Sequence, residues 1–126
     1  MALTILYVDD EADIREIASL SLGLDPGLTA LTAASGPEAV ARAKAGGIDL
    51  ILMDVMMPGV DGPTTLATLR ADAVTQAIPV AFVTARTQAH EVEHFRSLGA
   101  VGVIARPFDP MTLAATVRRL HATAME

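Results

Sequence analysis

Short apolar runs alternate with more polar, amphipathic segments along the chain. The runs span residues 5–8, 28–34, 49–54, 78–84 and 101–105, and their lengths are typical of β-strands. Their nearly continuous apolar character is typical of strands that are covered on both faces, as in a parallel sheet. The pattern therefore predicts five strands in a buried sheet.

Helices are predicted in the segments that follow these runs. They cover residues 11–20 with Leu24 continuing the face, a segment between Ser35 and Gly46, residues 63–72, residues 88–98, and a last segment from Asp109 towards His121. Strand and helix alternate five times, which predicts an α/β fold, a doubly wound five-stranded parallel sheet with right-handed crossovers. We expect one domain over residues 1–126, since this length suffices for one hydrophobic core.

Several side chains are predicted to fix the ends and faces of the helices. Asp10, Ser35 and Asp109 occupy N-cap positions, with Pro110 expected at the first helical position of the last helix, and Asp61 is expected to be a turn residue. The expected apolar face of the first helix consists of Ile14, Ile17 and Leu20. The three histidines, His90, His94 and His121, are expected to be exposed and solvated.

Composition and charge exclude several classes of protein. The chain has no cysteine, so it has neither disulfides nor thiolate metal sites. Its net charge is −6 and it has no cluster of basic residues, which argues against nucleic-acid binding. The apolar runs are too short to span a membrane, and the N-terminus does not resemble a secretory signal, so we expect a cytoplasmic protein.

Polar residues that could bind a ligand or react stand at the ends of four of the apolar runs. Asp9 and Asp10 follow the first run, while Asp54, Thr84 and Arg106 stand at the ends of three others. If the strands are parallel neighbours, these ends meet at one edge of the sheet, where open α/β folds bind ligands. Clustered carboxylates repel one another unless a cation lies between them, and Mg²⁺ prefers such oxygen ligands. The sequence therefore predicts a magnesium site.

A carboxylate beside a bound cation can also act as a nucleophile towards phosphorus, forming an acyl phosphate. Asp54, at the end of a strongly apolar run, is the candidate. The Thr84 hydroxyl and the Arg106 guanidinium could supply the donors and the positive charge that phosphoryl oxygens need.

Four stretches of the sequence together resemble the receiver domain of response regulators, the phosphoacceptor proteins of two-component signalling. They are Val8-Asp9-Asp10-Glu11, the segment from Leu52 to Gly62, Val83-Thr84-Ala85, and the segment from Gly99 to Phe108. They extend over nearly the whole chain, and their order and spacing are specific in combination. The resemblance implies a flavodoxin-like receiver fold and a stand-alone, single-domain response regulator.

The resemblance also implies roles for individual residues. Asp54 would be the phosphoacceptor, Asp9, Asp10 and Asp54 would bind Mg²⁺, and the Met56 backbone carbonyl would complete the protein's ligands. Thr84 and Arg106 would contact the phosphoryl group, with a cis peptide bond before Pro107. A histidine kinase or histidine phosphotransferase would be the donor, and the protein would assist its own phosphorylation and dephosphorylation without being an enzyme.

The signal would leave by phosphorylation-dependent binding to a downstream protein that the sequence does not identify. The last two helices and the strand between them are the expected surface, and a weak homodimer is a further option. The sequence departs from the family pattern at Arg106, where the family has lysine, and at Val103, where it usually has an aromatic residue that turns inward. These departures motivate an alternative, a receiver-like binding module that acts without phosphorylation.

Two other functions have weaker support. A phosphohydrolase with an aspartyl-phosphate intermediate usually has a second acid two residues after the nucleophile, where this chain has Met56. Nucleotide binding lacks both a glycine-rich dinucleotide fingerprint and a phosphate-loop lysine. His90 and His94 could share a metal, but two ligands are too few for a site.

Overall fold

The protein folds around a single sheet of five parallel strands. The computed structural model describes residues 2–126. The strand order is β2-β1-β3-β4-β5, so the chain winds outwards from β1 in both directions. The strands are β1 (Leu3–Val8), β2 (Leu28–Ala33), β3 (Leu50–Asp54), β4 (Val80–Thr84) and β5 (Gly102–Ala105).

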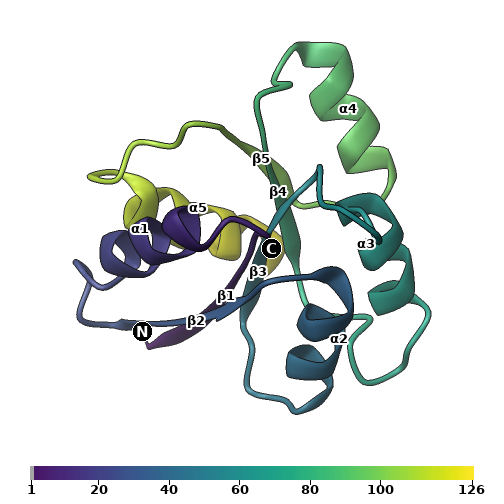
Figure 1. Cartoon of the computed structure of the whole chain (residues 1–126), viewed down its shortest axis with the longest axis horizontal. Coiled ribbons are helices and arrows are strands. Elements are labelled where there is room, and N and C mark those ends of the chain that lie inside the picture. Colours follow the sequence, from purple (N-terminus) through teal and green to yellow (C-terminus); the bar gives the residue numbers. More distant parts are fainter. Residues whose placement is uncertain (1) are drawn as a thin grey trace.

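Five helices connect the strands and cover both faces of the sheet. Figure 1 shows α1 and α5 together on one side, with α2, α3 and α4 on the other. The helices are α1 (Ala12–Leu22), α2 (Gly36–Lys44), α3 (Gly62–Arg70), α4 (Ala89–Ser97) and α5 (Leu113–Ala124). The predicted doubly wound α/β fold is confirmed.

Each face of the sheet has its own hydrophobic core, as the alternation of side chains along a strand requires. Leu6 and Val8 of β1 pack with Phe82 of β4 on the face covered by α2, α3 and α4. Ile5 and Tyr7 of β1 pack on the other face, against α1 and α5. The central strands β3 and β4 are buried along their whole length, in agreement with their apolar sequences.

The predicted apolar face of α1 is wrong in part. Ile17 and Leu20 are 42% and 69% exposed, whereas the helix buries Ala18, Ser21 and Leu22. Ala18 and Ser21 are small and let the helix approach the sheet closely. The Ser21 hydroxyl donates to the Ile17 carbonyl at 2.7 Å, so its burial leaves no unpaired polar group.

Two of the predicted helix caps and one predicted turn residue need correction. Glu11, not Asp10, is the N-cap of α1, and it makes no side-chain capping bond. Asp61 is not merely a turn residue but caps α3, since its carboxylate accepts from the Thr64 amide at 2.8 Å. Asp109 does not cap α5: it forms a tight turn by accepting from the Met111 amide at 2.9 Å, and the helix follows only after Thr112.

Other local predictions have mixed outcomes. Ser35 caps α2 as predicted and accepts from the Glu38 amide at 3.2 Å. His90 and His94 are exposed as expected, whereas His121 is buried, because α5 turns it towards the core. Within residues 2–126, no helix has the length and apolar character needed to cross a membrane.

Candidate functional site

The three aspartates identified in the sequence form one cluster at the carboxyl edge of the sheet. One carboxylate oxygen from each of Asp9, Asp10 and Asp54 can be chosen so that all three lie within 4.8 Å of one another. Asp9 and Asp54 are buried, and Asp10 is exposed. The structure thus brings together the three side chains that were predicted to bind the metal.

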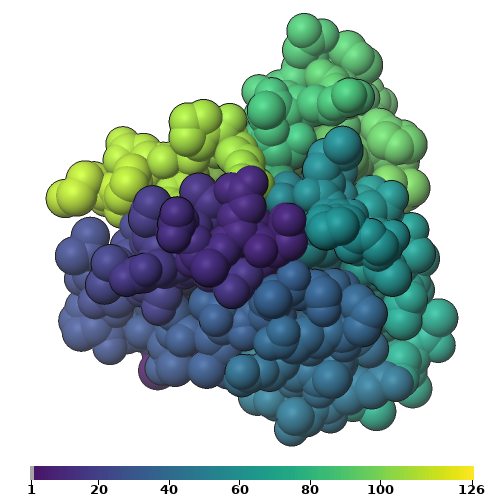
Figure 2. Space-filling model, in the orientation of Figure 1, coloured from purple at the N-terminus to yellow at the C-terminus, as the bar shows by residue number. Residues whose placement is uncertain are grey.

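The register of the two central strands produces this proximity. β1 and β3 are parallel neighbours, and Val8 pairs with Met53. The next residue on each strand is an aspartate, so Asp9 and Asp54 stand level at the sheet edge. In the space-filling view, the purple N-terminal segment there borders the teal segment after β3 and the yellow-green segment after β5 (Figure 2).

Backbone amides hold one oxygen of each buried carboxylate. Asp9 Oδ1 accepts from the Glu11 amide at 2.9 Å, and Asp54 Oδ1 accepts from the Met56 amide at 3.3 Å. Each bond closes a short turn directly after the strand. Both carboxylates are therefore oriented by the backbone, which limits their freedom to turn away from the cluster.

The loop after Asp54 is held close to the strand by a glycine. The Gly62 amide donates to the Val55 carbonyl at 3.0 Å. A Cβ atom at Gly62 would lie 2.6 Å from the Asp54 carbonyl oxygen, a distance that real Cβ atoms do not show. Glycine is therefore required here for the loop to return past the acceptor strand.

Arg106 reaches into the cluster from the end of β5. Its Nη1 atom donates to Asp54 Oδ2 at 2.8 Å and to Asp9 Oδ2 at 3.1 Å, while Nη2 donates to Glu11 Oε2 at 3.0 Å. Its backbone amide donates to the Thr84 carbonyl at 2.9 Å, which extends the pairing of β4 with β5. The Arg106-Pro107 peptide bond is cis, as the family resemblance implied.

The electrostatics of the site are dominated by burial. Burial raises the pKa of Asp54, and the positive charge of Arg106 offsets only part of this effect. Burial likewise raises the pKa of Asp9, opposed by the amide of Glu11. Burial disfavours the charge of Arg106, but attraction to Asp9 and Asp54 outweighs it and raises the pKa of the guanidinium. The buried acids therefore favour a nearby cation.

Thr84 ends β4 beside the cluster, and its side chain is buried. The hydroxyl oxygen accepts a hydrogen bond from the Arg86 amide at 3.0 Å. Its own proton is not used in that bond, so the hydroxyl retains a donor for an incoming group.

An open cleft lies next to these groups, and Met56, which is 73% exposed, lies at its rim. The cleft gives a ligand access to the carboxylate of Asp54 and to the end of β4. The residues that line it are Glu11, Asp54, Met56, Thr84, Ala85, Arg86 and Arg106.

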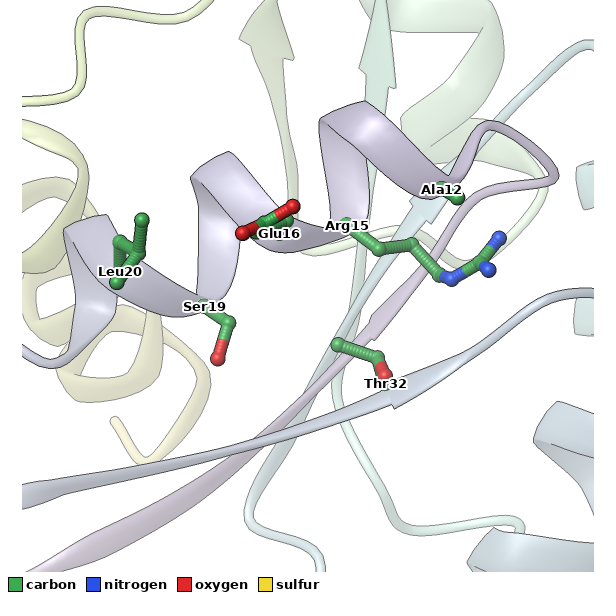
Figure 3. A pocket seen from close by; sticks show the side chains of 6 residues that line it. All are labelled: Ala12, Arg15, Glu16, Ser19, Leu20 and Thr32. Atoms are coloured by element: carbon green, nitrogen blue, oxygen red, sulfur yellow. The ribbon is translucent and has the colours of Figure 1, made fainter.

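A second groove lies between α1 and β2, and it has no comparable set of reactive groups. Its lining residues come from α1, apart from Thr32 of β2, which lies opposite the helix (Figure 3). Arg15 connects the groove to the cluster, because its Nη1 atom donates to the Asp9 carbonyl at 2.8 Å. This hydrogen bond restrains the backbone at Asp9.

Sequence reasoning did not assign roles to Glu11 and Arg15. The acidic run Asp9-Asp10-Glu11 was a signal for Glu11, since its third member also lies at the strand end. Arg15 gave no comparable signal, because a helical arginine is ordinarily solvated and its bond to the Asp9 carbonyl depends on the turn between β1 and α1.

The donor set fits a hard divalent cation. All the side-chain ligands are carboxylate oxygens, and none of the three histidines belongs to the cluster. Oxygen-only coordination suits Mg²⁺ better than zinc, which favours nitrogen and sulfur.

Comparison with known proteins agrees with this geometry. The family model of the response regulator receiver domain matches residues 5–118. The phosphate regulon transcriptional regulatory protein PhoB of Klebsiella pneumoniae is 35% identical over 130 residues, covering 100% of this chain and 56% of the relative. The response regulator Rre1 of Synechocystis is 36% identical over 120 residues, covering 95% of this chain and 52% of the relative.

Solved structures show the same fold over a whole chain. The chemotaxis protein CheY4 of Vibrio cholerae superposes with a TM-score of 0.85 and 32% identity, covering 95% of this chain and 99% of that chain. By contrast, the chain spans about half the length of the curated relatives it matches.

Proposed function

Because the chain belongs to the response regulator receiver domain family, we propose that Asp54 accepts a phosphoryl group from a histidine kinase or a histidine phosphotransferase. The observation that carries this proposal is the cluster of Asp9, Asp10 and Asp54 beneath an open cleft. The product would be an aspartyl phosphate.

Asp54 is the best placed of the three acids to act as the nucleophile. It ends the central strand β3, and it lines the cleft, whereas Asp9 is fully buried. One Asp54 oxygen would form the new bond to phosphorus while the bond from phosphorus to the donor nitrogen breaks. The amide of Met56, which donates to the other oxygen, would hold the carboxylate in position during attack.

Asp9, Asp10, Asp54 and the Met56 carbonyl would hold Mg²⁺. Their oxygen-only character supports this choice. When bound, the cation would supply positive charge next to the phosphoryl oxygens. The acids would otherwise repel an anionic phosphodonor, and so we expect phosphorylation to depend on Mg²⁺.

Thr84 and Arg106 would complete the phosphoryl site. The Thr84 hydroxyl has a proton free to donate, and it lines the same cleft as Asp54. The Arg106 guanidinium already lies 2.8 Å from Asp54 Oδ2, and it could donate to a phosphoryl oxygen on that side. The pair would stabilise the charge that the phosphoryl group brings into the site.

Output would occur through binding rather than through turnover of a substrate. Val103 lies on β5 and packs partly against the core on the side of α2, α3 and α4. Since it replaces the aromatic residue usual in the family, the signal would reach the α4-β5-α5 surface by a route other than rotation of an aromatic ring. The downstream partner is a protein, and the receiver would be no conventional enzyme.

Phosphorylation with a small-molecule phosphodonor tests the proposal. Wild-type protein incubated with radiolabelled acetyl phosphate and MgCl₂ should become labelled, and Asp54→Asn should not. Asp61→Asn is the matched control, because it makes the same chemical change nearby, at a residue that caps α3. An unlabelled wild-type chain would contradict the proposal and would favour a binding module that acts without phosphorylation.

A further inference from the structure

Two exposed histidines on α4 line one groove together with a carboxylate. His90 and His94 are four residues apart, so their side chains lie on the same face of the helix. We propose that their imidazoles bind a divalent transition-metal ion of the zinc class, and that Glu91 holds a water molecule on that ion. The site would be separate from the acidic cluster and would take a different class of metal.

The sequence around the two histidines has the pattern His-Glu-x-x-His. It is formed by His90, Glu91 and His94, and all five positions lie within α4. On a helix, this spacing directs both imidazoles to one ion and keeps the glutamate beside it. Two imidazoles alone are too few ligands for a stable site, so another polar group must lie close to the same ion.

The groove next to α4 supplies that group. His90, Glu91 and His94 all line it, and Met56, from the loop after β3, forms part of the opposite side. The carboxylate and the two imidazoles therefore share access to the same space. Met56 also lines the cleft at Asp54, so the groove and the acceptor cleft are neighbours.

The groups in the groove are available to a metal. Among residues 2–126, the rings of His90 and His94 have no hydrogen bond or ion pair, and the His94 ring contacts that of Phe95 with centroids 5.8 Å apart. Glu91 has a weak partner, since Arg86 Nη1 lies 4.0 Å from its Oε2 and the Arg86 side chain is 71% exposed. Such an exposed pair contributes little, so an ion can attract the carboxylate at small cost.

Binding would require the side chains to move closer together. Within the part of the chain that the structure describes, the three aspartates are the group whose ligand atoms all lie within 4.8 Å of one another. His90 and His94 would have to turn towards each other, and this loss of side-chain freedom limits the affinity. Selectivity would come from ligand type, because imidazole suits Zn²⁺ whereas Mg²⁺ prefers oxygen.

Titration of the whole chain with ZnCl₂, followed by NMR of the histidine side chains, tests the proposal. The ring resonances of His90 and His94 should shift together, with one common dissociation constant. Those of His121, which is buried on α5, should stay where they are. MgCl₂ at the same concentrations should not reproduce the shifts.

Substitutions in the groove should weaken Zn²⁺ binding in a definite order, measured by isothermal titration calorimetry. His90→Gln and His94→Gln each remove a ligand and should lose about a hundredfold in affinity. Glu91→Gln should lose about tenfold, as is typical when a group next to the ligands is removed. Glu93→Gln is the matched control, because it makes the same change on α4 at an exposed residue outside the groove, and it should bind as wild type does.

Asp10→Asn separates this site from the acidic cluster, and it should keep the full response of both histidine rings to ZnCl₂. The inference would be overturned if Zn²⁺ shifted neither ring, or if the response were lost in Asp10→Asn. Equal losses of affinity in Glu91→Gln and Glu93→Gln would also overturn it, since they would show an effect of overall charge. These outcomes do not depend on whether acetyl phosphate labels Asp54.

Discussion

Tyr7 carries a buried polar group that the fold leaves unpaired. Its ring is fully buried beneath the site, and it meets Phe108 edge-on, with centroids 6.1 Å apart. Among residues 2–126, its hydroxyl is the buried side-chain polar atom that has no hydrogen-bond partner. Burial raises the pKa of the Tyr7 phenol above its ordinary value, and the charge of Asp9 acts in the same direction. The hydroxyl therefore stays protonated and uncompensated.

Tyr7→Phe should stabilise the protein. The substitution keeps the ring and removes the hydroxyl, so we expect the free energy of unfolding to rise by about 1 kcal/mol. Urea denaturation at pH 7 without metal measures the change. Tyr7→Leu is the comparison, since it also removes the ring contact with Phe108 and should destabilise the fold. A Tyr7→Phe variant less stable than wild type would mean that the hydroxyl has a partner after all.

At the level of single residues, the sequence predicted which acids form the cluster, but not that Arg106 forms ion pairs with two of them. The strand-end positions of Asp9, Asp10 and Asp54 follow from the apolar runs alone, since parallel strands bring those ends together. The bridge from Arg106 depends on the direction taken by a long side chain at the end of β5. No periodicity in the sequence encodes that direction.

A pair of charges ties two elements together on the side of α1 and α5. Asp25, in the turn between α1 and β2, accepts from Arg118 of α5 at 2.6 Å to Nε and 3.0 Å to Nη2. The hydrogen bond from Arg118 lowers the pKa of Asp25 to about 2, with help from the amide of Gly27. The turn and the last helix are thus linked by a bidentate ion pair.

This link should make stability depend on pH in the acid range. The folded state binds the Asp25 proton less readily than the unfolded state, where the pKa is near the ordinary value of 3.8. The contribution is therefore complete above the unfolded-state pKa, and it is lost as the pH falls towards about 2. Urea midpoints between pH 5 and pH 2 should fall more steeply for wild type than for Asp25→Asn.

Asp13→Asn serves as the comparison in that series, because Asp13 is exposed on α1. Its acid profile should follow that of wild type. Parallel profiles for wild type and Asp25→Asn would show that the ion pair with Arg118 does not distinguish the folded from the unfolded state.

The elements themselves were predictable to different degrees. Strands were located well, because short, nearly continuous apolar runs are typical of strands buried on both faces of a parallel sheet. Helix starts were less predictable: Asp109 has both an N-cap signal and a turn signal, and the turn prevails because its carboxylate reaches the Met111 amide. The buried face of α1 was missed in part, since close packing selects the small Ala18 and Ser21 over Ile17 and Leu20.

At the scale of the whole molecule, different parts of the sheet stabilise the fold and form the acidic site. Apolar side chains on both faces bind the helices and stabilise the fold, while the carboxyl edge concentrates acidic groups. The net charge of −6 adds a diffuse repulsion that favours cations around the protein. A cation bound at the cluster would relieve the strongest part of that repulsion, because the buried carboxylates of the cluster are the charges that water screens least.

Magnesium should consequently stabilise the entire fold. A ligand that binds only the folded state adds about 2.7 kcal/mol when its concentration is a hundred times the dissociation constant. Wild-type protein should therefore unfold at a higher urea concentration in MgCl₂ than in NaCl of equal ionic strength. Asp10→Asn should lose most of this gain, because it removes one carboxylate of the cluster at an exposed position where the fold does not depend on it.

Asp13→Asn controls for the change in net charge, since Asp13 lies in the first turn of α1, three residues after Asp10, and is not part of the cluster. It should keep the full response to MgCl₂. If all three proteins respond equally, Mg²⁺ acts through general screening and not through the cluster. If Asp10→Asn alone loses the response, the acidic edge of the sheet is the binding site, and folding and metal binding are linked through it.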